Sequence, residues 1–66
     1  MTLRDVLLAC GNLKNSSLVM ITDEHGEVYS NTVEGCFVQN PIYMKMEVIF
    51  FKVFYGKNGD KIICLI

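Results

Sequence analysis

Residues 48–66, VIFFKVFYGKNGDKIICLI, decide the fold, because they predict one β-hairpin. Two runs rich in β-branched and aromatic residues, which strands prefer, flank a short polar turn. Asn58-Gly59 in that turn is a strong hairpin signal, since Asn and Gly tolerate the positive φ angles of a type I′ turn. With these two residues as the loop, the register places Val53 opposite Cys64.

Both faces of this predicted hairpin are largely apolar, because side chains alternate between the two faces of a strand. One face has no charge and consists of Ile49, Phe51, Val53, Tyr55, Ile62, Cys64 and Ile66. The other face contains two lysines and consists of Val48, Phe50, Lys52, Phe54, Lys61, Ile63 and Leu65. A sheet with one face in water shows polar residues on that face, so we expect both faces to be covered.

Residues 2–10 predict a short amphipathic helix. Thr2 and Asp5 have the spacing of a weak capping box at its start. The apolar stripe of one helix face is formed by Leu3, Val6, Leu7 and Cys10. So short a helix is not stable alone, and we expect it to dock on the uncharged face of the hairpin.

A second hairpin is predicted before the middle of the chain. Residues 17–22 are apolar on both strand faces, which indicates a strand inside the sheet. Gly26 suits the left-handed position of the turn that follows, in a three-residue loop with a bulge. Residues 28–30 are more polar and predict a short edge strand.

The segment from residue 31 to residue 44 is the hardest to interpret. Residues 34–38 are compatible with a short strand or with an extended connector. Asn40 and Pro41 resemble the cap and the first residue of a helical turn, after which the next strand would begin near Met46. The whole chain, residues 1–66, is therefore predicted to be a single α+β domain. It has a short N-terminal helix packed on a small antiparallel sheet of four to five strands that contains two hairpins.

Composition favours self-association. A chain of 66 residues is near the lower limit for a self-sufficient core, yet hydrophobic residues make up 52% of it. Some apolar surface must then stay exposed in a monomer, and pairing of copies is a natural way to bury it. The formal charge of −1 provides no strong field toward nucleic acid. It is unevenly distributed, with −3 in residues 1–40 and +2 in residues 41–66.

We expect a cytoplasmic protein with no membrane segment. No run approaches the roughly 20 apolar residues of a spanning helix, and no basic leader precedes an apolar core. Cys10, Cys36 and Cys64 are odd in number and lack a Cys-x-x-Cys spacing, so free buried thiols are expected.

No motif in the chain predicts catalysis, a cofactor or a metal. The acidic turn with Asp23, Glu24, His25 and Glu27 has ligand chemistry, but a solvated hairpin tip explains it better. His25 is the only histidine, and it lies far along the chain from each cysteine that it would need to activate. We therefore predict that the protein is not an enzyme.

The order of features also resembles a known group. Residues 2–8 (TLRDVLL) lead to residues 19–23 (VMITD) and residues 26–29 (GEVY), followed by an apolar strand near residues 47–49 and the end ICLI. This arrangement resembles small proteins of unknown function from Gram-positive gut bacteria and their prophages. The resemblance implies an α+β fold of a helix and a small sheet. It implies no known activity, so no functional residues follow from it.

The leading hypothesis is a non-enzymatic protein-interaction module that forms a homo-oligomer through its C-terminal hairpin. Aromatic rings interleaved with lysines also suit a small nucleic-acid-binding protein that uses the same face. A third interpretation is a phage-encoded inhibitor that docks on a host protein. The predicted partner-binding residues are Phe50, Lys52, Phe54, Lys61, Ile63 and Leu65.

Overall fold

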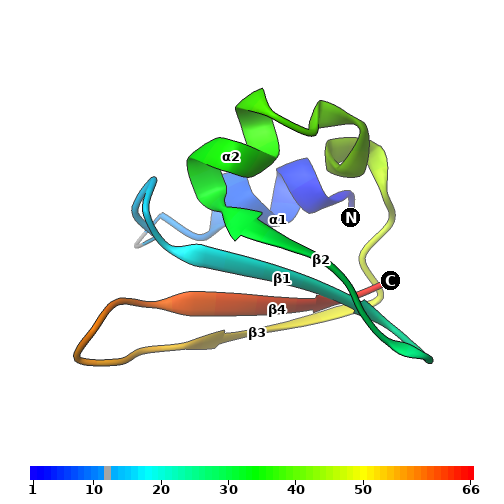
Figure 1. The fold of residues 1–66 in the computed structure, drawn as a ribbon. Helices are drawn as coiled ribbons and strands as arrows, with labels where there is room; N and C mark the ends of the chain where they lie inside the picture. The colour runs from blue at the N-terminus through cyan, green and yellow to red at the C-terminus, as the bar shows by residue number, and fades with distance from the viewer. Residues whose placement is uncertain (12) are drawn as a thin grey trace.

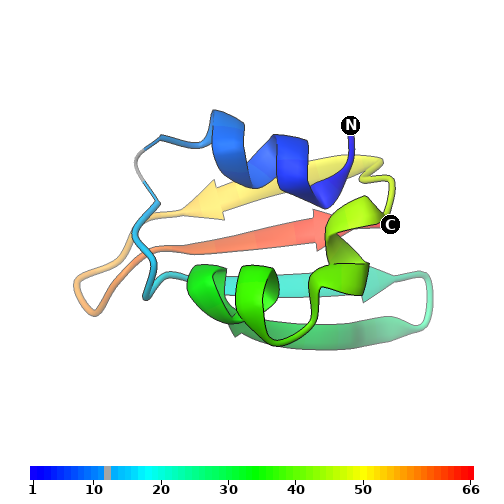
Figure 2. The same ribbon diagram turned by 90° about the horizontal axis from the view of Figure 1, so that it is seen from above.

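The computed structural model describes residues 1–11 and 13–66 and shows an α+β fold in two layers (Figure 1). A layer of helices lies on one side of a four-stranded sheet, as the view from above also shows (Figure 2). The predicted α+β class, with an N-terminal helix and two hairpins, is confirmed. In chain order the elements are α1 (Leu3–Ala9), β1 (Leu18–Asp23), β2 (Gly26–Thr32), α2 (Val33–Val38), the 3₁₀ helix η1 (Pro41–Lys45), β3 (Phe50–Phe54) and β4 (Lys61–Leu65).

The sheet is mixed, whereas the sequence predicted a wholly antiparallel one. Its strand order is β2-β1-β4-β3. The two hairpin pairs are antiparallel, but the central pair of β1 and β4 is parallel. The cause is the connection formed by residues 33–49, which carries the chain back along the sheet before β3 begins. The second hairpin therefore points in the opposite direction to the first, with its turn at the other end of the sheet, and the inner strands β1 and β4 run in the same direction.

The C-terminal hairpin has a register two residues away from the predicted one. Val53 pairs with Ile62 rather than with Cys64. The Gly59 N–H donates to the Gly56 carbonyl at 3.3 Å, so Asn58 is a central residue of a longer turn. Only Gly59 in that turn has a positive φ, of 124°. Because the shift is an even number of residues, every paired side chain stays on its predicted face.

The start of β3 also differs from the prediction, since the strand begins at Phe50 rather than near Met46. Val48 is buried, at 8% exposure, and Ile49 is 76% exposed, which reverses the faces expected for these two residues. The Val48 N–H donates to the Met1 carbonyl at 2.7 Å. Val48 is thus held under α1, and the chain bends at Ile49 before it enters the sheet.

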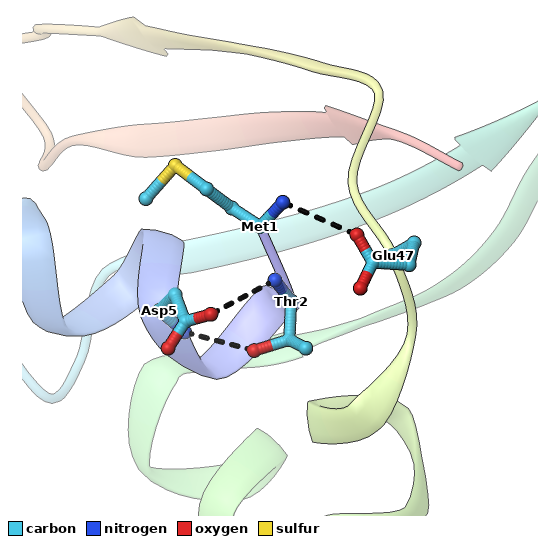
Figure 3. A network of polar contacts seen from close by, with 4 residues as sticks. All are labelled: Met1, Thr2, Asp5 and Glu47. Carbon is cyan, nitrogen blue, oxygen red and sulfur yellow. Dashed lines mark hydrogen bonds and ion pairs between the residues drawn. The ribbon is translucent and has the colours of Figure 1, made fainter.

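The N-terminal helix is fixed at its start by the predicted capping box (Figure 3). The Asp5 N–H donates to the Thr2 hydroxyl at 3.3 Å, and the Thr2 N–H donates to the Asp5 carboxylate at 3.1 Å. These bonds with Thr2 lower the pKa of Asp5. The Met1 amino group also lies 3.2 Å from the Glu47 carboxylate, beside a bridge between Thr2 and Glu47. The start of α1 is thereby tied to the chain that enters β3.

The core lies between the helices and the sheet. As predicted, α1 packs on the uncharged face of the C-terminal hairpin, and the helices cover the corresponding residues of β1 as well. β1 is an inner strand and β2 is an edge strand, which confirms both predictions, and Gly26 has the expected positive φ, of 116°. The core residues are Leu3, Val6, Leu7, Val19, Ile21, Val33, Cys36, Met44, Val48, Ile62 and Cys64.

Residues 33–38 form helix α2, so the strand or extended connector predicted for residues 34–38 is wrong. Thr32 caps this helix, because its hydroxyl accepts a hydrogen bond from the Gly35 N–H at 3.0 Å. Pro41 is at the first position of a helical turn, as predicted. Asn40, however, makes no side-chain capping bond there, since its amide donates instead to the Tyr29 hydroxyl at 2.7 Å.

The same tyrosine joins β2 to the helix layer. Its hydroxyl also accepts from the Asn31 amide at 2.7 Å, and its ring stacks on Tyr43 with centroids 4.5 Å apart. Asn31 donates further to Gln39 at 2.8 Å. These contacts link β2, the end of α2 and η1, and they explain why two short helices with low intrinsic helix propensity hold their places.

Among the described residues, no helix has the length and apolar character that crossing a membrane requires.

Candidate functional site

On the sheet face opposite the helices, nine side chains from β3, β4 and β1 form a grid, beside which lies edge strand β2. We call this grid the open sheet face. Its three rows follow from the strand pairing and from the burial of the alternate residues, such as Val19 and Ile62, on the helix side. The rows are Phe50–Leu65–Thr22, Lys52–Ile63–Met20 and Phe54–Lys61–Leu18.

The structure brings all six predicted contact residues together on this face. They form the β3 and β4 columns of the grid. No described segment of the chain lies on this side of the sheet (Figure 1). Several large apolar side chains therefore stay in contact with solvent, and Phe50 is 61% exposed. A monomer thus leaves a continuous apolar surface uncovered.

Sequence reasoning missed the third column of the grid, formed by Leu18, Met20 and Thr22 of β1. The apolar character of this strand on both faces was visible in the sequence and indicated an inner strand. The parallel pairing with β4 was not visible, because it depends on the crossover formed by residues 33–49. Residues far apart in the sequence therefore extend the surface beyond the C-terminal hairpin.

Two lysines are packed against the aromatic side of the open sheet face. The Lys52 ammonium lies 5.3 Å from the centre of the Phe54 ring, and the Lys61 ammonium lies 5.6 Å from it. Such contacts are worth about 0.5–1 kcal/mol at exposed sites. Neither lysine forms an ion pair with a described residue. The remaining residues of the grid carry no charge and are Phe50, Leu65, Thr22, Ile63, Met20 and Leu18.

A shallow hollow lies at each end of the sheet. One is lined by Leu18, Phe54 and Tyr55 together with the β3–β4 turn. The other lies at the opposite end and is lined by Asp23, Glu24, Ile49, Leu65 and Ile66. The first end is rich in lysine and the second is acidic, so the two ends of the sheet differ in charge.

The acidic turn between β1 and β2 is an exposed hairpin tip. The His25 N–H donates to the Asp23 carboxylate at 2.7 Å, which closes the turn. The His25 ring lies 3.4 Å from the Glu24 carboxylate, and both side chains are more than 80% exposed. Within the described residues, no three His, Cys, Asp or Glu side chains are grouped so that they could hold a metal ion.

The three cysteines are free thiols, and two of them are buried in the core. Burial raises the pKa of the Cys36 thiol. Burial, with a smaller contribution from Cys10 and Cys36, raises the pKa of Cys64 to about 11. At neutral pH both buried groups are therefore protonated, and a protonated thiol is a poor nucleophile.

We expect the thiols to differ sharply in reactivity. Cys10 is partly exposed and should react with a thiol reagent in the native protein. Cys36 and Cys64 should react only when the fold opens, because they are buried and remain protonated. Counting labelled thiols by mass spectrometry over time, with and without denaturant, measures this difference. Equal labelling rates for the three cysteines in the native protein would contradict it.

Comparison of the chain with known protein families, curated proteins and solved structures finds no match.

Proposed function

We propose that this protein is a non-enzymatic protein-interaction module that self-associates through the open sheet face. One observation supports the proposal: both faces of the sheet are apolar, and the described chain covers only one of them. Free cysteines are consistent with a cytoplasmic setting for this function. The part played by such an assembly is set by what its helix layer displays, since the helices face outward once two open sheet faces meet.

The energy available from this surface is moderate. Full burial of a large apolar side chain is worth roughly 1.5–3 kcal/mol, and Phe50, Phe54 and Leu65 already have part of their surface covered. Association costs about 4–15 kcal/mol in lost freedom of the two copies. The whole chain has 4474 Å² of accessible surface, so a standard interface of about 800 Å² per copy would cover a large share of it. We therefore expect a dissociation constant of about 1–100 µM.

Phe54→Glu tests the surface. The substitution replaces an apolar ring of the interface with a carboxylate that self-association would bury, and we expect it to weaken self-association by about a hundredfold or more. In the monomer the new carboxylate can pair with Lys52 and Lys61, which lie around the ring, so folding should persist. The mass in solution is measured by light scattering behind a sizing column over a range of protein concentrations. Circular dichroism verifies that the variant is folded.

Leu8→Glu is the matched control, because it introduces the same charge at an exposed apolar residue of α1, on the helix side. It should leave the mass unchanged. If the Phe54→Glu variant still self-associates, or if Leu8→Glu causes the same dissociation, the open sheet face is not the contact surface.

The lysines beside Phe54 also favour a second candidate function, binding of single-stranded nucleic acid by the same face. The dependence on salt concentration distinguishes nucleic-acid binding from self-association. Phosphate contacts weaken steeply as salt rises, whereas apolar pairing is maintained or strengthened. A monomer that binds an oligonucleotide only at low salt would favour nucleic acid. A monomer without such binding would leave inhibition of a host protein as the candidate function.

A further inference from the structure

We propose that the occupant of the open sheet face is a second copy related by a two-fold axis that runs across the strands. In this arrangement the basic end of one sheet lies over the acidic end of the other. The inference rests on the proposed function and specifies its geometry. It follows from the positions of the charges at the two ends of the sheet and from the limited number of ways in which two sheets can pack.

The two ends of the sheet carry opposite charge. Because β1 and β4 are parallel, the β1–β2 turn and the β3–β4 turn lie at opposite ends, as Figure 1 shows. We define the basic end as Lys14, Lys57, Lys61 and Asp60, which together carry 3 − 1 = +2. We define the acidic end as Asp23, Glu24 and Glu27, which carry −3.

Packing of sheets restricts the arrangement. In the aligned class of face-to-face packing, which alone places one end of a sheet over an end of the other, the strands of the two sheets stay within about 30° of each other. A two-fold axis between them then runs either nearly along the strands or nearly across them. An axis along the strands brings the two basic ends together and the two acidic ends together. An axis across the strands places each basic end over an acidic end, so charge complementarity favours it.

The same axis pairs the apolar rows of the grid. The middle row lies on the axis, so Ile63 of one copy faces Ile63 of the other. The outer rows exchange, which places Phe50 over Phe54 of the second copy. Lys52 then faces its own counterpart, but it is on edge strand β3, where its ammonium can reach water at the rim. The most exposed aromatic side chain of the face is thereby covered.

Charge reversal at one end tests the arrangement. Lys57→Glu with Lys61→Glu turns the basic end from +2 to −2, which makes both ends acidic. At low salt we expect this variant to dissociate about tenfold more readily than the wild type. Glu24→Lys with Glu27→Lys makes both ends basic instead, and it should weaken the dimer because like charges then face each other. All four changes together make the ends opposite again and should restore most of the affinity. Dissociation constants are measured by analytical ultracentrifugation.

A matched control separates position from net charge. Arg4→Glu with Lys45→Glu changes the net charge by the same amount on the helix side and should leave the dissociation constant unchanged. In about 1 M salt the differences between all variants should disappear, because charges are then screened beyond about 3 Å.

The outcomes distinguish the two proposals. If the wild type forms a dimer whose dissociation constant the basic-end reversal leaves unchanged, the proposed axis across the strands is wrong. The proposal of self-association is then retained. If the dimer weakens with either reversal and recovers with both, the arrangement is supported. A wild type that remains monomeric at millimolar concentration overturns both the arrangement and the proposed self-association, whether or not it binds an oligonucleotide.

Discussion

Replacing Ile62 with Ala is expected to lower the free energy of unfolding by about 2–5 kcal/mol. The Ile62 side chain is fully buried on the helix side of β4, where it lies between Val19 of β1 and Val53 of β3. Truncation removes buried methylene groups and leaves a cavity that a tightly packed small core cannot refill. For a chain of 66 residues this loss is a large part of the total stability.

The neighbouring residue provides the matched control. Ile63 is adjacent in sequence but points to the open sheet face, opposite Met20 and Lys52. Ile63→Ala should change the free energy of unfolding of the monomer by less than about 1 kcal/mol and should weaken self-association instead. Urea denaturation at a protein concentration below the dissociation constant measures the stability of the monomer alone, since association adds apparent stability to the folded state. Equal costs for the two substitutions would mean that the open sheet face is covered within the chain.

This contrast between neighbours was predictable from the sequence, and its robustness has a simple cause. Alternation places Ile62 and Ile63 on opposite faces in any register, and a register shift of two residues leaves each of them on its predicted face. The hairpin was predicted with a two-residue loop and has a longer turn, yet Val53 and Phe54 still lie on the expected faces. Local pattern therefore located the β3 and β4 part of the candidate site.

Local pattern failed where tertiary contacts override it. Val48 and Ile49 continue an apolar run, but the contact of Val48 with the Met1 carbonyl bends the chain there. Helix α2 contains a β-branched residue at its start and Gly35 in its interior, and both lower helix propensity. Its helix is stabilised by the Thr32 cap and by packing of Cys36 in the core, which no short window of sequence reveals.

Missing α2 had a consequence for the site. Without a helical crossover, the two predicted hairpins had no reason to point in opposite directions. The parallel pairing of β1 with β4 follows from that crossover and places Leu18 and Met20 on the open sheet face. The distribution of charge between the two ends depends on the same pairing. The sequence showed that its two parts differ in charge, and only the topology places those charges at opposite ends of one surface.

Replacing Gly35 with Ala is expected to lower the free energy of unfolding by about 1–3 kcal/mol, although in most helices the same change raises it by about 1 kcal/mol. A Cβ atom at position 35 would overlap the side chain of Asn31. That side chain cannot move without cost. Its oxygen accepts from the Thr32 N–H at 2.7 Å, and its amide donates to Tyr29 and Gln39 at 2.7 and 2.8 Å. Thermal or urea unfolding measures the effect.

A second background tests the cause of this loss. Asn31→Ala removes the overlapping group, so in that background Gly35→Ala should be neutral or stabilising by up to about 1 kcal/mol. A reversal of sign shows that contact with Asn31, rather than a need for glycine flexibility, selects Gly35. This position has no positive φ, so backbone conformation by itself does not require glycine there. If Gly35→Ala stabilises the wild-type chain, the helix has room to move away from β2, and the polar network around Tyr29 holds it less firmly than its bond lengths indicate.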